Sequence, residues 1–303
     1  MAVDLYTHLH HSAIPEDLRR LLMTLAITGK YISAKIGAAN RKLAGTHNVY
    51  GEAQLELDKA CDHLFISRLK ESALVREFAS EEQGQIITMA KPEGRYSVTV
   101  DPLDGSSLVD VNLAIGSIIG VHDGDLIIGG PRNLVAAAYV LYGPLTTFVY
   151  TAGKGTHEFV LNPEGEFVLA TENIRMQEKG ELYSIGALRE SWIPSHAKFV
   201  AQLESEGYKL RYSGALVADV NLILLKGGGV FTYPGSTKAP QGKLRLLFEL
   251  EPLALIMEQA GGAATDGTQR ILEMKVNKLD ARAPIYIGSK YEVMKAKECL
   301  SER

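Results

Sequence analysis

The stretch that decides the fold of this chain runs from Tyr96 to Ser107 and reads Tyr-Ser-Val-Thr-Val-Asp-Pro-Leu-Asp-Gly-Ser-Ser. Its first half, from Tyr96 to Val100, alternates in polarity, which is typical of a strand that enters a core. Pro102 lacks a backbone N–H and fixes φ, while Gly105 permits close backbone approach. The sequence therefore predicts that the strand stops at Pro102 and turns sharply.

Oxygen atoms gather at this predicted turn. The carboxylates of Asp101 and Asp104 and the Leu103 carbonyl are ligands that hard divalent cations prefer. If Gly105, Ser106 and Ser107 open a helix, their amides form an anion site beside the cation. A cation next to a phosphate is the arrangement of metal-assisted phosphoryl chemistry. A plain surface turn is the alternative interpretation, because Asp-Pro-x-Asp-Gly also forms good turns.

The overall composition is that of a globular protein. With 303 residues, 46% of them hydrophobic, the chain buries a large core, and its length suggests roughly two domains. A net charge of -4 and the lack of Lys/Arg runs argue against a nucleic-acid partner. Cys61 and Cys299 fit no disulfide or metal spacing, which indicates a reducing compartment. No window has signal-peptide or transmembrane character, so we expect a cytoplasmic protein without a membrane partner.

Three histidines lie near the N-terminus, at His8, His10 and His11. Clustered histidines bind metals in some proteins, but chain termini are usually poorly ordered. We therefore expect this segment to be a solvated, disordered tail.

Hydrophobic periodicity predicts helices alternating with strands. The first predicted helix begins at residue 15 and ends between residues 37 and 45, and the second begins at residue 52. Four further helices are predicted at residues 195–207, 214–226, 252–260 and 290–300. The predicted strands cover residues 74–78, 96–100, 115–122, 134–142, 146–151, 158–161, 167–170, 182–185, 230–233 and 285–287. The stretch from Glu172 to Gly180 is polar and charged, so we place a boundary there between residues 1–175 and 176–303. This alternation indicates a layered α/β fold.

Further polar groups lie at predicted element ends. Glu81 and Glu82 follow the strand predicted at residues 74–78. Arg211, Lys243 and Arg245 are suited to phosphate. Taken singly, each of these side chains is more often a solvated surface group.

Five motifs taken together resemble the class I fructose-1,6-bisphosphatase family over nearly the whole chain. They are Ser80-Glu81-Glu82, Asp101 to Ser107, Arg132 to Ala137, Arg211-Tyr212, and Gly242 to Glu249. The resemblance implies the layered αβαβα sugar-phosphatase fold with two intimately packed subdomains, the first carrying the metal- and AMP-type region and the second binding substrate. It also implies Mg²⁺-dependent hydrolysis of the 1-phosphate of fructose 1,6-bisphosphate, giving fructose 6-phosphate and phosphate.

The resemblance also assigns metal ligands and a water-activating pair. By position, the family's ligands match Glu81, Asp101, the Leu103 carbonyl, Asp104 and Glu249. Glu82 with Asp58 matches the pair that activates water. Glu52 falls where the family has an aspartate on a mobile loop reaching a further metal. Because Glu52 has a longer side chain, the number of ions is left at two or three, with Mn²⁺ as the alternative to Mg²⁺.

The same resemblance implies a substrate site and an oligomer. Asp104, Gly105, Ser106 and Ser107 match the residues at the scissile phosphate, with Arg245 nearby. Lys243 matches the sugar contact, and Tyr212 and Tyr233 match the contacts to the distal phosphate. Arg211 matches an arginine that crosses into a neighbouring subunit's site, so a homo-oligomer, either a dimer or a tetramer, is expected.

One segment departs from the pattern. Fructose-1,6-bisphosphatases typically supply an Asn and a Tyr to the distal phosphate where this chain reads Tyr183-Ser-Ile-Gly-Ala-Leu-Arg189. The Gly186 to Arg189 pattern is similar to sedoheptulose-1,7-bisphosphatases, and Arg189 is suited to clamp the distal phosphate. The open alternatives are a seven-carbon or dual-specificity bisphosphatase, a monoesterase of the inositol-monophosphatase type, and a non-catalytic sugar-phosphate sensor.

Overall fold

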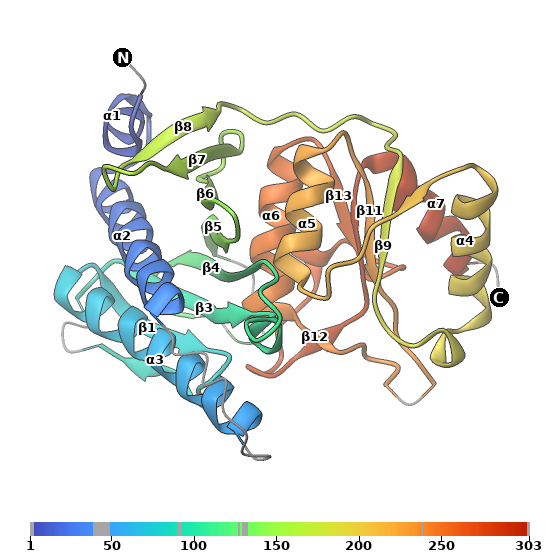
Figure 1. The fold of residues 1–303 in the computed structure, drawn as a ribbon, viewed down its shortest axis with the longest axis horizontal. Coiled ribbons are helices and arrows are strands. Elements are labelled where there is room, and N and C mark those ends of the chain that lie inside the picture. The colour runs from blue at the N-terminus through green and yellow to red at the C-terminus, as the bar shows by residue number, and fades with distance from the viewer. Residues whose placement is uncertain are drawn as a thin grey trace.

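The computed structural model describes residues 3–38, 49–89, 93–126, 128, 133–237 and 239–301, and residues 49–56 of α3 by their backbone alone. Figure 1 shows five layers: helices α1 to α3, a large sheet, helices α5 and α6, a second sheet, and helices α4 and α7. The expected αβαβα architecture is therefore observed. Arg132, which belongs to one of the five motifs, lies outside the described residues.

The first two layers come from the N-terminal half. The helices are α1 (Leu5–His11), α2 (Glu16–Ala38) and α3 (Val49–Ser72). The eight-stranded sheet has the order β2-β1-β3-β4-β5-β6-β7-β8, and only β1 and β3 are parallel. Its strands are β1 (Val75–Ser80), β2 (Ile87–Thr88), β3 (Tyr96–Asp104), β4 (Ile115–Asp123), β5 (Leu134–Tyr142), β6 (Thr146–Thr151), β7 (His157–Leu161) and β8 (Phe167–Thr171).

The C-terminal half supplies the other layers. Helices α5 (Leu216–Leu225) and α6 (Glu251–Gln259) lie between the sheets, and α4 (Pro194–Ser205) and α7 (Lys290–Ser301) form the outer layer (Figure 1). The second sheet has the order β10-β9-β11-β15-β13. Its strands are β9 (Leu182–Ile185), β10 (Lys209–Leu210), β11 (Gly229–Tyr233), β13 (Ala263–Thr265) and β15 (Ile285–Gly288). A separate pair joins β12 (Leu244–Arg245) to β14 (Arg282–Ala283).

A single buried core joins the two sheets. It contains Ala137 and Tyr139 from β5, Phe231 from β11, and Ile285 from β15, with α5 and α6 packed between them. Burying one large apolar side chain stabilises a fold by about 1.5–3 kcal/mol, so this shared layer holds the halves together strongly. The subdomain boundary near residue 175 stays a prediction, since the two halves share this core.

The N-terminal segment contradicts the prediction of a solvated tail. Residues Leu5 to His11 form helix α1, and the Asp4 side chain caps it by accepting the Thr7 N–H at 2.7 Å. Leu5 and Leu9 are 2% and 1% exposed, and the Leu169 N–H donates to the Val3 carbonyl at 2.8 Å. The prediction failed because a seven-residue helix has little periodic signal and depends on tertiary packing.

The predicted stop at Pro102 is also wrong, because β3 continues to Asp104. Along β4 the partners of Asp101 and Asp104 are Ile118 and Gly116, so β3 carries one extra residue in this interval. This is a β-bulge, a place where a sheet tolerates proline and re-aims side chains. The Pro102 carbonyl is satisfied by the Ser117 hydroxyl, which donates to it at 2.7 Å.

The remaining predicted helices and strands are confirmed to within a few residues. No helix in the described part of the chain is long and apolar enough to cross a membrane.

Candidate active site

Three carboxylates from distant parts of the sequence meet at one edge of the large sheet. Glu81 follows β1, Asp101 lies in the neighbouring parallel strand β3, and Glu249 lies in a π-helical turn, η3 (Leu246–Leu250), that precedes α6. One oxygen from each carboxylate lies within 4.8 Å of the others. Parallel neighbours place their carboxyl ends at the same edge, and π-turns are frequent at functional sites. The local fold thus converges acids that are far apart in sequence.

Two of the three carboxylates are buried, while the Glu81 side chain is 25% exposed, and the three repel one another. Asp101 and Glu249 are each 5% exposed. Burial, followed by the negative charge of Glu81, raises the pKa of Asp101 and of Glu249 well above the usual range. Buried like charges are stable only if they bind protons or a cation. The three carboxylates are therefore suited to bind a cation.

Arg245 brings a positive charge into contact with this group. Its Nε lies 3.1 Å from Glu81 Oε1, and its Nη1 donates to the Glu81 carbonyl at 2.7 Å. The Arg245 backbone N–H donates to Glu249. One guanidinium compensates part of the charge of three carboxylates, so room for further positive charge remains.

Asp104 and Leu103 occupy the bulge beside the group. Asp104 Oδ2 accepts the Val217 N–H at 2.7 Å, at the start of α5, and Leu103 donates its N–H to Asp101 Oδ1 at 3.0 Å. Burial raises the pKa of Asp104 to about 7, and the charge of Glu81 adds to this effect. Asp104 is close enough to raise the pKa of Asp101 and Glu249, although it is not among the three carboxylates that lie within 4.8 Å of one another.

Asp58, Glu82 and Ser106 lie next to these acids. Ser106 Oγ donates to Asp58 Oδ2 at 3.2 Å, and Asp58 Oδ1 is buried without a partner among the described residues. Burial and then the Glu82 charge raise the pKa of Asp58 to about 6. Burial, followed by the charge of Glu81, also raises the pKa of Glu82. The two acids expected to activate water therefore share one electrostatic environment.

The Gly105-Ser106-Ser107 segment forms less helix than expected. Ser106 to Leu108 make a single 3₁₀ turn, η1, that follows Gly105 at φ 78°. A Cβ on Gly105 would lie 2.6 Å from the Ala215 Cβ, just before α5. Glycine is needed here both for its backbone conformation and for this close approach.

Three of the expected substrate residues gather on one side of Asp104. The Lys243 Nζ lies 5.8 Å from the centre of the Tyr233 ring, and the Lys243 charge lowers the pKa of Asp104 against the larger effect of burial. Burial, followed by Tyr233, raises the pKa of Tyr212, whose side chain points partly into solvent. The structure thus brings Lys243, Tyr212 and Tyr233 together beside the acids.

The other expected residues lie apart from this group or are not described. Arg211 is exposed and donates from Nη1 to the Leu210 carbonyl at 2.7 Å. The Arg189 guanidinium lies 6.0 Å from the centre of the Trp192 ring. Within the described ranges, neither arginine forms an ion pair with the carboxylate group. Ser107 is exposed, and the side chain of Glu52 lies outside the described residues.

The sequence reasoning missed the supporting roles of two residues. Asp219, in the first turn of α5, is buried, accepts the Ser213 N–H at 2.8 Å, and raises the pKa of Asp104. Gly186 packs under the Tyr233 ring, because a Cβ there would lie 2.1 Å from Tyr233 Cδ2. The available signals were an acid in an otherwise apolar helix and a glycine where the family pattern has a larger residue.

Comparison with known proteins matches both halves of the chain. Residues 5–172 match the fructose-1-6-bisphosphatase N-terminal domain, and residues 176–301 match the C-terminal domain. The chain is 48% identical over 299 residues to the class 1 fructose-1,6-bisphosphatase of Trichlorobacter lovleyi, covering 98% of this chain and 95% of that protein. It is 45% identical over 292 residues to the corresponding protein of Methanocorpusculum labreanum, covering 96% and 89%.

Solved structures give the same answer for the fold. The holo form of Leishmania major fructose-1,6-bisphosphatase superposes with a TM-score of 0.88 at 32% identity, covering 100% of both chains. The T-state of the same enzyme gives 0.89 at 33% identity, again over 100% of both chains. Since both domains match in order and full-length relatives are nearly half identical, this chain belongs to the fructose-1,6-bisphosphatase family.

Proposed function

We propose that this protein is a divalent-metal-dependent phosphatase that hydrolyses the 1-phosphate of fructose 1,6-bisphosphate. The observation that carries the proposal is the group of Glu81, Asp101 and Glu249, with ligand atoms within 4.8 Å of one another and Arg245 at their side. The products are fructose 6-phosphate and inorganic phosphate. The class 1 fructose-1,6-bisphosphatases that resemble the chain over nearly its full length support the same reaction.

The donor set fits a hard dication. All of its side-chain donors are carboxylate oxygens, and in Asp101 and Glu249 burial and then the neighbouring negative charge raise the pKa. Glu81, Asp101, Asp104, Glu249 and the Leu103 carbonyl would hold two Mg²⁺ ions, or Mn²⁺ in their place, and Glu52 would reach a third. Such ions, when bound, neutralise phosphoryl oxygens and lower the pKa of water.

The chain's own residues position the substrate and move the proton. Asp58, with a pKa of about 6, is suited to accept a proton near neutrality from the attacking water, and Glu82 shares that role. Ser106 orients Asp58 through its 3.2 Å hydrogen bond, and Arg245 offers its guanidinium to the scissile phosphate. Lys243 would bind the sugar, and Tyr212 and Tyr233 the distal phosphate.

We further propose that the active protein is a homo-oligomer, a dimer or a tetramer. Arg211 is exposed, and its Nη1 donates to the Leu210 carbonyl, which suits a side chain that completes a neighbour's site. An arginine is well matched to a phosphate by its planar, bidentate donor fork. The location of the protein in the cytoplasm stays a prediction.

Phosphate release from fructose 1,6-bisphosphate tests the proposal directly. We expect turnover with Mg²⁺ or Mn²⁺, none with excess EDTA, and recovery when the metal is restored. Protein that stays folded and binds Mg²⁺ but releases no phosphate from this sugar or its seven-carbon analogue would contradict the proposal. Binding of the sugar without turnover would favour a sensor.

A second candidate substrate is sedoheptulose 1,7-bisphosphate. Gly186 packs directly against the Tyr233 ring, so the larger residue that the family has at this position is absent from the distal end of the site. This difference favours a longer sugar. Exposed Arg189 lies nearby in sequence and is suited to the displaced phosphate.

Arg189→Ala should separate the two substrates. If Arg189 clamps the distal phosphate, we expect KM to rise by about tenfold or more, with kcat changed far less, because the lost contact is uniform binding. The rise should be larger for the seven-carbon sugar. Arg20→Ala, on the outer helix α2, is the matched control and should leave both constants unchanged. Equal KM values for wild type and Arg189→Ala would remove Arg189 from the substrate site.

A further inference from the structure

A second cluster of ligating side chains lies at the opposite end of the large sheet from the carboxylate group. His8 comes from α1, His157 begins β7, and Glu172 follows β8. One potential ligand atom from each lies within 4.8 Å of the other two. Strands β4, β5 and β6 separate this cluster from β3, so it is distinct from the site described above.

The fold holds this cluster in place. His8 is on the helix whose start pairs with β8, through the Leu169 N–H bond to Val3 and the bridge between Asp4 and Val168. The centre of its ring lies 4.7 Å from that of His157 and 5.2 Å from that of Phe159. His8 therefore packs against the β7–β8 hairpin, unlike His10 and His11, which are exposed on the same helix.

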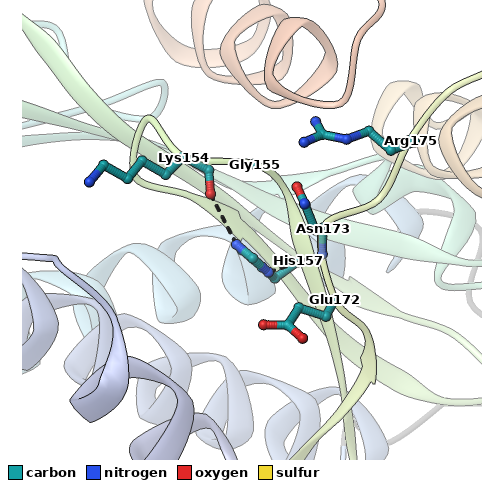
Figure 2. Close-up of a pocket in the computed structure, with 6 residues that line it drawn as sticks. All are labelled: Lys154, Gly155, His157, Glu172, Asn173 and Arg175. Atoms are coloured by element: carbon teal, nitrogen blue, oxygen red, sulfur yellow. Dashed lines mark hydrogen bonds between the residues drawn. The ribbon is translucent and has the colours of Figure 1, made fainter.

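A cavity of about 420 Å³ opens beside the cluster. Figure 2 shows it lined by His157, Glu172 and Asn173 with Lys154, Gly155 and Arg175. The Arg175 side chain is engaged elsewhere, since its Nη1 donates to the Gln259 carbonyl at 3.0 Å. The Glu172 side chain is 65% exposed and so has room to move toward the histidines.

Both histidines are suited to bind a metal in their neutral form. Burial, and then His157, lowers the pKa of His8, and burial lowers the pKa of His157. His157 Nε2 donates to the Lys154 carbonyl at 3.2 Å, the outer hydrogen bond that commonly orients a ligating imidazole. Its Nδ1 accepts the backbone N–H of exposed Asn173 at 3.1 Å, so a metal at Nδ1 would replace this bond and leave the N–H to solvent.

Tyr150 supplies an independent observation. Its side chain is 1% exposed, and its hydroxyl has no hydrogen-bond partner within the described part of the chain. Its ring centre lies 5.4 Å from that of His157 and 6.1 Å from that of His8, and burial followed by Glu172 raises its pKa. Buried hydroxyls are normally bonded, so this oxygen beside the cluster calls for a partner such as a metal-bound water.

We propose that His8, His157 and Glu172 form a binding site for a divalent transition metal of the Zn²⁺ type, which ties helix α1 to the β7–β8 hairpin. Two imidazoles and one carboxylate are a common Zn²⁺ ligand set with one position open to water, and imidazole ligands disfavour Mg²⁺. Zn²⁺ binds such ligands at about 2.0–2.2 Å, so the ligand atoms must draw together slightly. The exposed Glu172 side chain has the space for this closure.

The test is a Zn²⁺ titration of the intact protein at saturating Mg²⁺, followed by equilibrium dialysis and by NMR of the histidine ring nitrogens. Wild type should bind one more Zn²⁺ than His8→Gln or His157→Gln at a given free concentration. Loss of an outer-shell partner lowers metal affinity by roughly 10–100-fold. Loss of a ligand in His8→Gln or His157→Gln should lower the Zn²⁺ affinity of this site by more than that. His10→Gln and His11→Gln, on the exposed face of α1, should leave binding unchanged.

A stability measurement keeps the proposal testable if a histidine variant folds poorly. Glu172→Gln changes an exposed side chain and should fold normally. Zn²⁺ should raise the Tm of wild type and of His10→Gln but raise that of Glu172→Gln much less. Equal stoichiometry and equal Zn²⁺-dependent Tm shifts in wild type, His157→Gln and Glu172→Gln would overturn the proposal, as would loss of the site in His10→Gln.

Discussion

At the residue scale, Asp104 carries two separable roles. It is an acid of the proposed metal site, and it also caps α5, whose own N-cap residue, Ala215, has no side chain able to do so. Asp104→Asn keeps an acceptor for the Val217 N–H, and Asp104→Ala removes it, whereas both remove the charge. We expect turnover to fall at least about 100-fold in both. By urea unfolding, Asp104→Ala should be less stable than Asp104→Asn by about 1 kcal/mol. Equal stabilities would refute the capping role.

His196 makes the stability depend on pH. Its ring is fully buried, Nδ1 contacts the Tyr286 hydroxyl at 3.0 Å, and burial lowers its pKa from 6.5 to about 4. Below pH 6.5 the unfolded chain takes up a proton that the folded chain refuses, so stability is lost as the pH falls from 6.5 to 4. The loss is about 1.4 kcal/mol per pH unit, or about 3 kcal/mol in all.

Urea unfolding between pH 7 and pH 4.5 checks this sign. His196→Gln should show a shallower decline than wild type, while His63→Gln, an exposed residue on α3, should follow wild type. The acidic site titrates equally in all three proteins, so its effect cancels in the comparison. A decline of equal slope in wild type and His196→Gln would contradict the predicted role.

How much of the site the sequence predicts depends on the kind of residue. Glu81 is recognisable as an acid at the end of a predicted strand, whereas Glu249 was assigned through the family resemblance, because burial and like-charge repulsion appear only in three dimensions. The supporting roles of Asp219 and Gly186 were missed because they act through other residues, Asp104 and Tyr233, and such contacts exist only in three dimensions. The histidine at position 8 was misjudged for the same reason.

At the element scale, the strongest periodic elements were predicted well and the exceptions have physical causes. Helix α2 shows a clear apolar stripe, with Leu18, Leu22 and Leu25 buried against the sheet. Helix α1 is too short to carry such a stripe, and β3 passes Pro102 because the register changes there. Local rules predict where a chain is able to turn, whereas the neighbouring strand decides whether it does.

The turn between β3 and η1, where Gly105 packs against the start of α5, offers an element-scale prediction. Gly105→Ala places a methyl group 2.6 Å from the Ala215 Cβ and forces alanine to φ 78°. We expect a loss of about 1–3 kcal/mol, together with lower turnover because Ser106 moves relative to Asp58. Adding Ala215→Gly should restore the part of the stability that the clash removes, leaving a loss of about 1–2 kcal/mol from backbone strain.

A double-mutant cycle measured by urea unfolding gives the coupling between the two positions. Ala215→Gly alone should change stability little, since glycine is acceptable at an N-cap. Additive effects of the two substitutions, with no recovery in the double variant, would contradict the proposed contact.

At the scale of the whole molecule, the five layers follow from the order of helices and strands, because each sheet must bury both faces. What the sequence does not provide is the assembly of several chains. The proposal that Arg211 completes a neighbour's site rests on the exposure of Arg211 and on the family resemblance. It predicts that a complete active site contains residues from two chains.

Mixing two inactive variants tests this assembly. Arg211→Ala should be inactive because each site lacks its neighbour's arginine, and Asp104→Asn because each site lacks its own acid. After unfolding and refolding together in equal amounts, the mixture should regain about a quarter of wild-type turnover, since half of random pairs are mixed and each mixed pair has one complete site. A mixture of Asp104→Asn with Asp58→Asn, both defective within their own chain, should stay inactive. If the first mixture also stays inactive while sedimentation shows mixed oligomers, Arg211 acts within its own chain or not at all, and the proposal of shared sites is wrong.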